Sequence, residues 1–207
     1  MSRIEKLIPL VRSYYSSEDP AHDWPHVKRV MGNARLICQT EQAQEELVLA
    51  AVLCHDLVNL PKNHPDRSQA STLAAQEAKN HLLNSGFLPS EIDIIQKAIV
   101  EHSFSKGLKP SILEAAIVQD ADRLDALGAI GILRCASVNT QMKSSFYDLD
   151  DPMAKVRELN DKKFMLDHYF VKLFKLPELM NTSSGRLIAE ERVSFMRHFL
   201  KQLTLEI

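Results

Sequence analysis

Hydrophobic residues recur along the chain at intervals of three and four positions, which is the pattern of amphipathic helices. No stretch alternates apolar and polar residues convincingly with the period of two that a half-buried strand requires, and no internal repeat or low-complexity segment is visible. The pattern therefore predicts an all-α fold. Helices are expected at about residues 2–16, 23–39, 43–58, 67–84, 90–103, 111–138, 152–176 and 185–205.

Residues that typically begin or end helices support these boundaries. Pro25 suits the first turn of a helix, and Gly86 is the residue type that most often follows the last turn. Gly128 and Gly131, inside the long helix predicted at about 111–138, indicate close packing rather than a phosphate-binding loop, because no strand precedes them. Two pairs have the spacing of a capping box, namely Ser90 with Asp93 and Ser111 with Glu114.

The composition is that of a globular protein large enough to bury a substantial core. The 207 residues carry a formal net charge of −2, with acidic and basic residues spread along the chain. That distribution argues against duplex nucleic acid as a partner, and no apolar run is long enough to predict a membrane partner. The N-terminus lacks the apolar core of a signal peptide. Cys38, Cys54 and Cys135 are expected to be reduced core thiols, so a cytoplasmic location is expected.

The dipeptide His55-Asp56 directly follows the apolar stretch Leu47–Cys54. Ionisable side chains are costly in such a buried setting unless they are paired or bind a metal. An imidazole and a carboxylate are ligand types that suit a hard or borderline divalent metal. The dipeptide alone is weak evidence, and it gains weight from His26 upstream and from the acidic run at 120–125 downstream.

These segments, in this order, resemble the HD-domain superfamily of metal-dependent phosphohydrolases. The words HDWPHVKRV, IVEHSFS and QDADRLDALGAIGI are similar to one bacterial branch of that superfamily. The resemblance covers roughly the first two thirds of the chain, to about residue 134. It implies an HD-domain helical bundle with additional C-terminal helices. The family pattern of H…HD…D falls on His26, His55, Asp56 and Asp122.

The resemblance implies that these four residues are metal ligands. His26 is expected in the first turn of its helix, His55 and Asp56 near the end of theirs, and Asp122 in the long helix. Two imidazoles and two carboxylates from three helices would hold one divalent ion of Mn, Mg, Fe, Co or Ni. About two positions would remain for water and a phosphate oxygen.

Asp56 and His102 are the predicted catalytic residues. Asp56 would bind the metal and orient the attacking water. His102 matches the histidine of the IVEHSFS word and is expected to contact phosphate or donate a proton. Relatives with two metals use extra histidines after the HD pair, but this chain lacks the paired histidines of such sites, which favours one metal.

Three residues are expected to support the ligands through hydrogen bonds. Asp120 and Asp122 are two positions apart, about 200° round a helix, so both cannot point directly into one site. Asp120 is therefore predicted to orient a ligating histidine. Asp125 would do the same or pair with Arg29. His22 precedes the helix and is expected to cap it or form a hydrogen bond rather than bind the metal.

Basic residues near the predicted metal face are candidates for binding phosphate. Arg123 follows the metal aspartate, where relatives that hydrolyse nucleotide phosphates often carry a basic residue, although a solvated surface arginine is the alternative. Lys62, Lys106 and Lys109 lie in two predicted loops that could border the pocket. The expected partner is a small phosphorylated metabolite or a nucleotide.

The whole chain, 1–207, is predicted to form a single HD-type domain. Its core would span about 20–138, and a C-terminal helical extension of about 151–207 would cover the site or form homodimer contacts. The predicted activity is hydrolysis of a phosphate ester or anhydride. Two alternatives stay open: a metal-binding regulatory module without turnover, and a cyclic-nucleotide phosphodiesterase or alarmone hydrolase. A two-metal phosphodiesterase would need more histidine ligands, and a regulatory module would have a pocket too closed or too apolar for phosphate.

Overall fold

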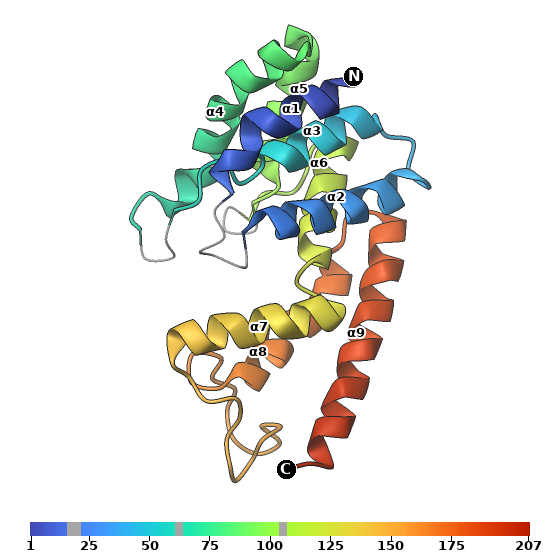
Figure 1. The fold of residues 1–207 in the computed structure, drawn as a ribbon. Helices are drawn as coiled ribbons and strands as arrows, with labels where there is room; N and C mark the ends of the chain where they lie inside the picture. Colours follow the sequence, from blue (N-terminus) through green and yellow to red (C-terminus); the bar gives the residue numbers. More distant parts are fainter. Residues whose placement is uncertain (16–21, 61–63, 104–106) are drawn as a thin grey trace. The chain divides into compact units, whose positions relative to one another are not determined.

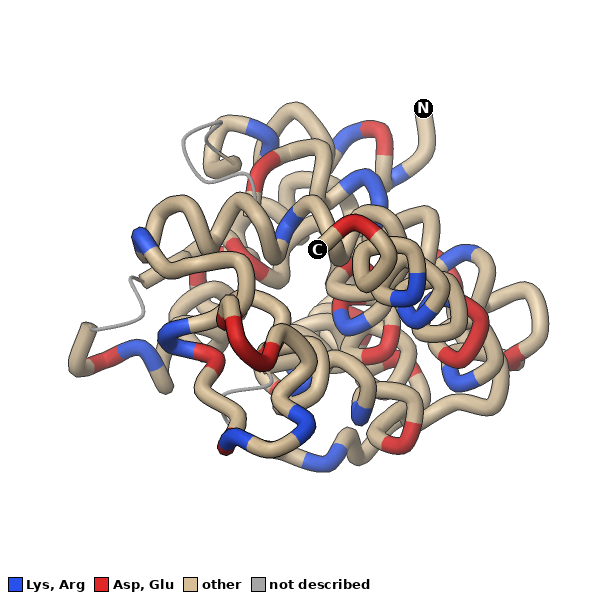
Figure 2. Tube along the Cα trace, turned by 90° about the horizontal axis from the view of Figure 1, so that it is seen from below, with Lys and Arg blue, Asp and Glu red and all other residues tan. Residues whose placement is uncertain are grey.

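A computed structural model describes residues 1–15, 22–60, 64–103 and 107–207 (Figure 1). Regular structure in the described residues is helical, and two residues, Ser145 and Phe164, form an isolated bridge outside any strand. The all-α fold class is therefore confirmed. None of the described helices combines the length and the apolar character that crossing a membrane requires. Acidic and basic positions are interspersed along the trace (Figure 2).

The chain divides into two compact units, residues 1–122 and 123–207. The boundary falls inside the stretch predicted as one long helix at about 111–138. That helix is wrong, because the stretch forms two helices, α6 (Leu113–Leu124) and α7 (Gly128–Met142). The turn between them is closed by backbone hydrogen bonds from Ala126 to Arg123 and from Leu127 to Leu124.

Gly128 makes the break between α6 and α7 possible. Its φ of +71° lies in the left-handed region, which strains residues that carry a Cβ. A Cβ there would also lie 3.2 Å from the side chain of Arg192. The sequence-based explanation by helix packing therefore missed the main reason for this glycine. At Gly131 a Cβ would lie 2.3 Å from the carbonyl oxygen of Ala126, so close approach does explain that residue.

The first unit is organised around α3 (Glu45–Cys54), which packs against its neighbours α1 (Arg3–Val11), α2 (Trp24–Cys38) and α5 (Pro89–Glu101). All eight residues of the segment 47–54 are buried. A helix that is apolar all round belongs in a core, and burying each of its larger aliphatic side chains contributes about 1.5–3 kcal/mol. α4 (Ala70–Ser85) packs on α5 and α1. The C-terminal end of α3 therefore lies in the interior of the first unit.

Two local signals act as the sequence predicted. Pro25 lies in the first turn of α2, whose cap is Asp23, because the Asp23 side chain accepts a hydrogen bond from the backbone N–H of His26. Gly86 ends α4 with a φ of +93°, the left-handed conformation expected of a helix-terminating glycine. These boundaries are set by side chains within one turn of the helix end, which is why a local pattern suffices to find them.

Two predicted capping boxes are wrong. Helix α5 begins at Pro89, one residue early, and the carboxylate that accepts the backbone N–H of Leu88 at 2.8 Å belongs to Glu91. Ser111 donates its hydroxyl hydrogen bond to Glu101 at 2.7 Å, so its hydroxyl serves a contact to the preceding helix. In both places a carboxylate nearer in space took the role that sequence spacing had assigned to another residue.

The second unit contains α7, α8 (Met165–Val171) and α9 (Ser183–Thr204), with a 3-10 segment at Leu173–Leu179. Helix α9 packs on α7 and on the 3-10 segment. The helix predicted at about 152–176 is wrong over its first half, because Asp151 forms a turn there. Its carboxylate accepts the backbone N–H groups of Lys155, Val156 and Arg157 at 2.8–3.1 Å.

Candidate metal centre

His26 is buried, with 0% of its surface exposed, in the first turn of α2. Its backbone N–H donates to the capping carboxylate of Asp23 at 2.8 Å. This bond satisfies one of the amide groups that a helix start leaves without a partner, and it fixes the backbone that carries the imidazole. The capped end of α2 therefore presents His26 to the interior of the first unit.

His55 and Asp56 follow the last residue of α3, Cys54. Tyr15 stabilises this helix end, because its buried hydroxyl donates to the carbonyl oxygen of Leu53 at 2.8 Å. Burial raises the pKa of the Cys54 thiol, so it stays protonated and serves the core. The end of α3 thus offers a nitrogen donor and an oxygen donor rather than a thiolate.

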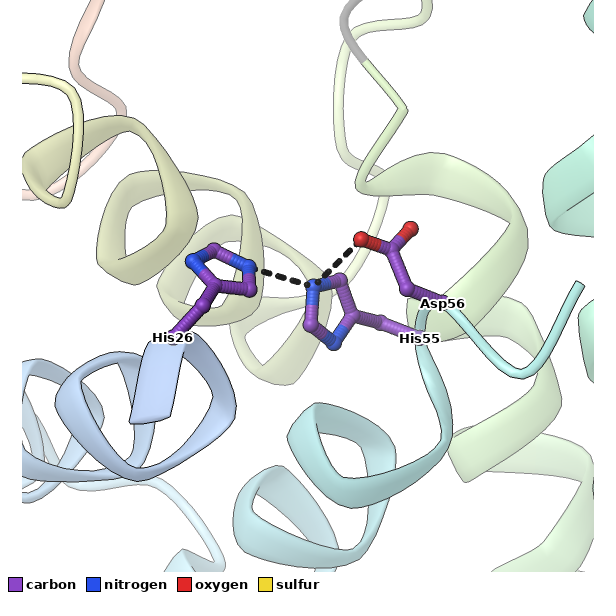
Figure 3. Close-up of side chains that lie close together, drawn as sticks. All are labelled: His26, His55 and Asp56. Atoms are coloured by element: carbon purple, nitrogen blue, oxygen red, sulfur yellow. Dashed lines mark hydrogen bonds and ion pairs between the residues drawn. The ribbon is translucent and has the colours of Figure 1, made fainter. Parts of the chain in front are cut away.

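The three side chains converge on one point (Figure 3). The Nε2 atoms of His26 and His55 are 3.4 Å apart, and His55 Nε2 lies 3.3 Å from Oδ2 of Asp56. One ligand atom from each of the three residues lies within 4.8 Å of the others. The three come from the beginning of α2 and the end of α3, which are far apart in the sequence but adjacent in the first unit.

Asp122 adjoins this cluster from α6. Its Oδ1 lies 3.6 Å from His26 Nε2 and 4.0 Å from His55 Nε2. The structure thus brings the four predicted ligands together within the first unit. Their role as metal ligands stays a prediction.

The hydrogen bond at the far side of the His55 ring decides which nitrogen faces the cluster. Nδ1 of His55 lies 2.7 Å from the carbonyl oxygen of Val52. A carbonyl only accepts, so Nδ1 carries the hydrogen, and Nε2 of the neutral ring has a lone pair directed toward His26 and Asp56. That lone pair can be satisfied by a hydrogen on Nε2 of His26, 3.4 Å away, or by a cation among the donor atoms.

The donor set fits a six-coordinate divalent cation. With metal–ligand bonds of about 2.1 Å, neighbouring ligand atoms are about 3.0 Å apart and opposite ones about 4.2 Å. The distances of 3.3, 3.4, 3.6 and 4.0 Å in the cluster lie within that range. Imidazole nitrogen and carboxylate oxygen together suit first-row transition metals and magnesium.

Electrostatics favour ionised carboxylates at this cluster. Burial alone would raise the pKa of Asp56, but the surrounding histidines His55, His22, His102 and His26 outweigh burial and lower it when they are protonated. The pKa of Asp122 is likewise lowered against the effect of burial, by His26, His55 and His102. Both carboxylates are therefore charged at neutral pH and ready to bind a cation.

His102 has the same arrangement as His55. Each directly follows a helix, and each places Nδ1 against the carbonyl oxygen three residues earlier, which for His102 is Ile99 at 2.5 Å. Nε2 of His102 lies 3.9 Å from Oδ1 of Asp56, and the ring centroids of His55 and His102 are 5.0 Å apart. Burial lowers the pKa of His102, and so does repulsion from His55 whenever that ring is protonated, which favours the neutral form of His102 with Nε2 as a hydrogen-bond acceptor.

The three residues predicted to support the ligands lie in different surroundings. His22 packs its ring edge-on against His26 at 5.9 Å between centroids, and the cap of α2 is Asp23. Asp120 is fully buried in α6, two residues before Asp122. Asp125 lies in the second unit, where its carboxylate forms an ion pair with Arg134.

The predicted phosphate-binding residues are less well placed by the structure. Lys62 and Lys106 lie outside the described residues. Lys109 is exposed. Arg123 directly follows Asp122, but one of its guanidinium nitrogens donates to the carbonyl oxygen of Leu179 within the second unit. Part of the hydrogen-bonding capacity of Arg123 is therefore used inside the protein.

Two residues near the site were missed from the sequence. Tyr15 supports the helix end before His55, and Asn33 donates its side-chain amide to the carbonyl oxygen of Ala121, next to Asp122, at 3.0 Å. Both act on backbone atoms far away in the sequence. The one available signal for Asn33 was its polarity on the apolar face of the helix at about 23–39.

Comparisons with known proteins agree with this geometry. A model of the HD domain matches residues 24–127. The chain is 33% identical over 211 residues to the uncharacterized protein YpgQ of Bacillus subtilis strain 168, covering 100% of this chain and 95% of that protein. The crystal structure of Bacillus subtilis YpgQ in complex with ADP has a TM-score of 0.77 and 31% identity, covering 99% of this chain and 95% of that one.

A crystal structure of an HD-superfamily hydrolase from Bacillus thuringiensis has a TM-score of 0.77 and 29% identity, over 99% of this chain and 96% of that one. The matched segment 24–127 contains His26, the His55-Asp56 pair and Asp122, which are the residues that converge in the first unit. Sequence, structure and site therefore agree that this chain belongs to the HD domain family.

Proposed function

We propose that this protein is a metal-dependent phosphohydrolase that cleaves a phosphate ester or anhydride, and that its substrate is a nucleotide or a related small metabolite. The observation that carries the proposal is the cluster of His26, His55 and Asp56, with Asp122 beside it at 3.6 and 4.0 Å from the Nε2 atoms of the two histidines. The HD-superfamily hydrolase among the structural relatives supports a hydrolytic reaction.

His26, His55, Asp56 and Asp122 would hold one divalent ion, of Mn, Mg, Fe, Co or Ni. Such an ion supplies a Lewis acid that polarises a phosphate oxygen and lowers the pKa of coordinated water. The protein's part is to hold the His55 ring with Nε2 toward the cluster, through the bond from Nδ1 to Val52, and to keep Asp56 and Asp122 charged. The two carboxylates then bind a cation without first losing protons.

His102 and Asp56 would act on the water that attacks phosphorus. The two oxygens of Asp56 face different histidines, with Oδ2 toward His55 and Oδ1 toward His102. A water molecule that donates one hydrogen bond to Asp56 and another to Nε2 of His102 would have its lone pair directed away from both. His102 would take up the proton at Nε2 and return it to the leaving oxygen. His102 would thus first accept a proton, as the position of its Nε2 favours, and then donate it, as predicted from the sequence.

A nucleotide is the favoured substrate class. Bacillus subtilis YpgQ, similar over nearly its whole length, has been crystallised in complex with ADP. Arg123 and Lys109 stay the predicted phosphate ligands among the described residues, and Arg123 would use the guanidinium nitrogens that do not face Leu179. Arg123→Ala should then raise KM while the metal content is unchanged, whereas unchanged KM and kcat would make this arginine structural.

The test is a hydrolysis screen of the purified protein against nucleoside mono-, di- and triphosphates, cyclic nucleotides, alarmones and sugar phosphates. Each reaction is run with Mn²⁺, Mg²⁺, Co²⁺ or Ni²⁺ and with a chelator. We expect release of phosphate or pyrophosphate that the chelator abolishes. His55→Ala is the matched negative control, because it removes a donor atom from the centre of the cluster.

The outcomes separate the alternatives. Turnover confined to cyclic nucleotides or alarmones would replace the proposed substrate class with one of those. Metal binding without turnover of any phosphate compound would favour a regulatory module. Turnover that persists in chelator and in His55→Ala would refute the metal centre itself.

A further inference from the structure

Asn33 is a polar residue in the core of the first unit, with 5% of its surface exposed. It lies on α2, and its Nδ2 donates to the carbonyl oxygen of Ala121 in α6 at 3.0 Å. A buried amide group is retained at little cost only when it is hydrogen-bonded. This bond joins two helices that each supply one of the proposed metal ligands.

The acceptor has an unusual position relative to the site. The carbonyl of Ala121 and the backbone N–H of Asp122 belong to one rigid peptide plane. A hydrogen bond to that oxygen therefore restrains the plane immediately before the Cα of Asp122. Ala121 also lies in the last turn of α6, which ends at Leu124.

The donor shares a helix face with His26. Asn33 follows His26 by seven positions, which is two turns of α2, so both side chains project from the same side. His26 Nε2 in turn lies 3.6 Å from Oδ1 of Asp122. The same face of α2 thus contacts Asp122 twice, through His26 at the side chain and through Asn33 at the preceding peptide.

We propose that Asn33 is a positioning residue for the metal centre, holding Asp122 of α6 at the correct distance from His26 of α2. The inference rests on the proposed function, since it requires that these residues bind a metal. Without the amide, the last turn of α6 could shift by a few tenths of an ångström. The carboxylate would then reach the cation only by distorting the shell of ligands, which weakens binding.

The chain offers a matched control. Gln96 on α5 donates its side-chain amide to the carbonyl oxygen of Ala75 on α4 at 2.6 Å. The bond has the same chemistry, lies in the same unit and also joins two helices, but neither helix carries a proposed ligand. A purely structural role for Asn33 would make the two amides equivalent in every measurement.

The experiment compares wild type with Asn33→Ala, Asn33→Ser and Gln96→Ala. Thermal midpoints of the metal-free proteins report folding, and titration with Mn²⁺ by calorimetry reports affinity. Visible spectra of the Co²⁺ forms report the coordination geometry. Asn33→Ser is the milder change and keeps the comparison usable if Asn33→Ala does not fold.

We expect the Asn33 variants to bind Mn²⁺ about 10-fold more weakly or worse, with altered Co²⁺ spectra. Gln96→Ala should lower the thermal midpoint of the metal-free protein while its Mn²⁺ affinity and Co²⁺ spectrum match those of wild type. If the Asn33 variants keep wild-type affinity and spectra, the positioning role is wrong although the metal centre stands. If wild type itself binds neither ion, the proposed function fails and the inference fails with it.

Discussion

Each unit of this protein places a carboxylate beside basic groups, but the two arrangements differ in how closely those groups pair with the carboxylate. In the second unit, Asp167 has no exposed surface, and its two oxygens accept hydrogen bonds from Arg157 at 2.6 and 2.7 Å. The backbone N–H of Asn160 adds a third bond at 2.6 Å. This carboxylate is neutralised by the protein itself, which leaves it little capacity for a ligand.

Asp56 and Asp122 in the first unit face imidazoles instead. Among the described residues, their nearest basic neighbours are His55 at 3.3 Å and His26 at 3.6 Å, beyond ordinary hydrogen-bonding distance. Asp167-His168 is also an adjacent Asp/His pair, like His55-Asp56, but it forms different contacts. His168 bonds to Asp161 at 2.9 Å and Asp167 to Arg157, so that pair diverges. Burial of a charge therefore indicates a functional site only when the partners around it are incomplete.

The largest effect is expected from Asp122→Ala, which removes a charged oxygen donor from the proposed metal centre. We expect loss of most bound metal and of all hydrolysis, because three remaining ligands hold a divalent ion poorly. Elemental analysis of the purified variant and the hydrolysis assay provide the measurement. Retention of a full equivalent of metal would show that Asp122 is dispensable and that the four-ligand arrangement is incorrect.

The complementary change is Arg157→Ala in the second unit, which leaves Asp167 buried and without its guanidinium. The free energy of unfolding should fall by about 3–5 kcal/mol, the usual consequence of breaking a buried ion pair. Metal content per folded chain should not change. Chemical denaturation of the metal-free protein measures the first effect and elemental analysis the second.

Arg35→Ala is the control for that experiment. Arg35 pairs with Glu45 at 3.8 Å, and both side chains are about half exposed. An exposed pair of this kind contributes at most about 1 kcal/mol. Equal losses from Arg35→Ala and Arg157→Ala would contradict the difference drawn between the two settings.

Asp120→Asn should have a smaller effect than Asp122→Ala. The two residues project from different sides of α6, and Asp120 is predicted to act through a hydrogen bond rather than as a ligand. Metal should be retained, with affinity reduced about 10–100-fold. Parallel Mn²⁺ titrations of the two variants decide the ranking, and the opposite order would mean that the register of the site on α6 is wrong.

The smallest expected effect is the pH dependence of the Arg157–Asp167 pair. Burial alone would raise the pKa of Asp167, but the bonds from Arg157 and from the backbone of Asn160 outweigh it and lower the pKa. A lowered pKa in the folded state means that the ion pair stabilises the protein above the unfolded pKa, which is about 3.9. This stabilisation is lost as pH falls toward the folded value.

Wild type and Asp167→Asn should therefore be compared by urea denaturation between about pH 3 and pH 7, without metal. The difference in unfolding free energy should stay constant above about pH 5 and shrink below about pH 4. Contributions from Asp56 and Asp122 are common to both proteins and cancel. A difference that grows on acidification would mean that the pKa of Asp167 is raised.

The sequence predicted the fold class and the helix ends that depend on neighbouring residues, such as Pro25 at the start of α2 and Gly86 at the end of α4. Prediction from the sequence failed where contacts between residues far apart in the chain determine the local structure. The break at Gly128 was hidden because the apolar pattern continues through the turn between α6 and α7. The irregular segment before α8 was hidden because Asp151 resembles the start of a helix, although its carboxylate closes a turn.

The same distinction applies to the residues of the candidate site. The HD pair and its spaced companions could be found because the buried apolar helix before His55 makes an ionisable pair conspicuous. Asn33 and Tyr15 could not be found, because each acts on a backbone carbonyl that only the fold brings near. Arg123 was assigned from its position beside Asp122, and the sequence contains no sign of its bond to Leu179.

The buried thiol of Cys54 has a consequence for the protein's reactivity toward oxidants and alkylating reagents. Peroxides and alkylating reagents attack thiolates, and burial raises the pKa of this cysteine so far that the thiolate is essentially absent at neutral pH. The residue beside His55 is thus chemically inert. Thiol-directed reagents should therefore leave this end of α3 unmodified as long as the protein stays folded.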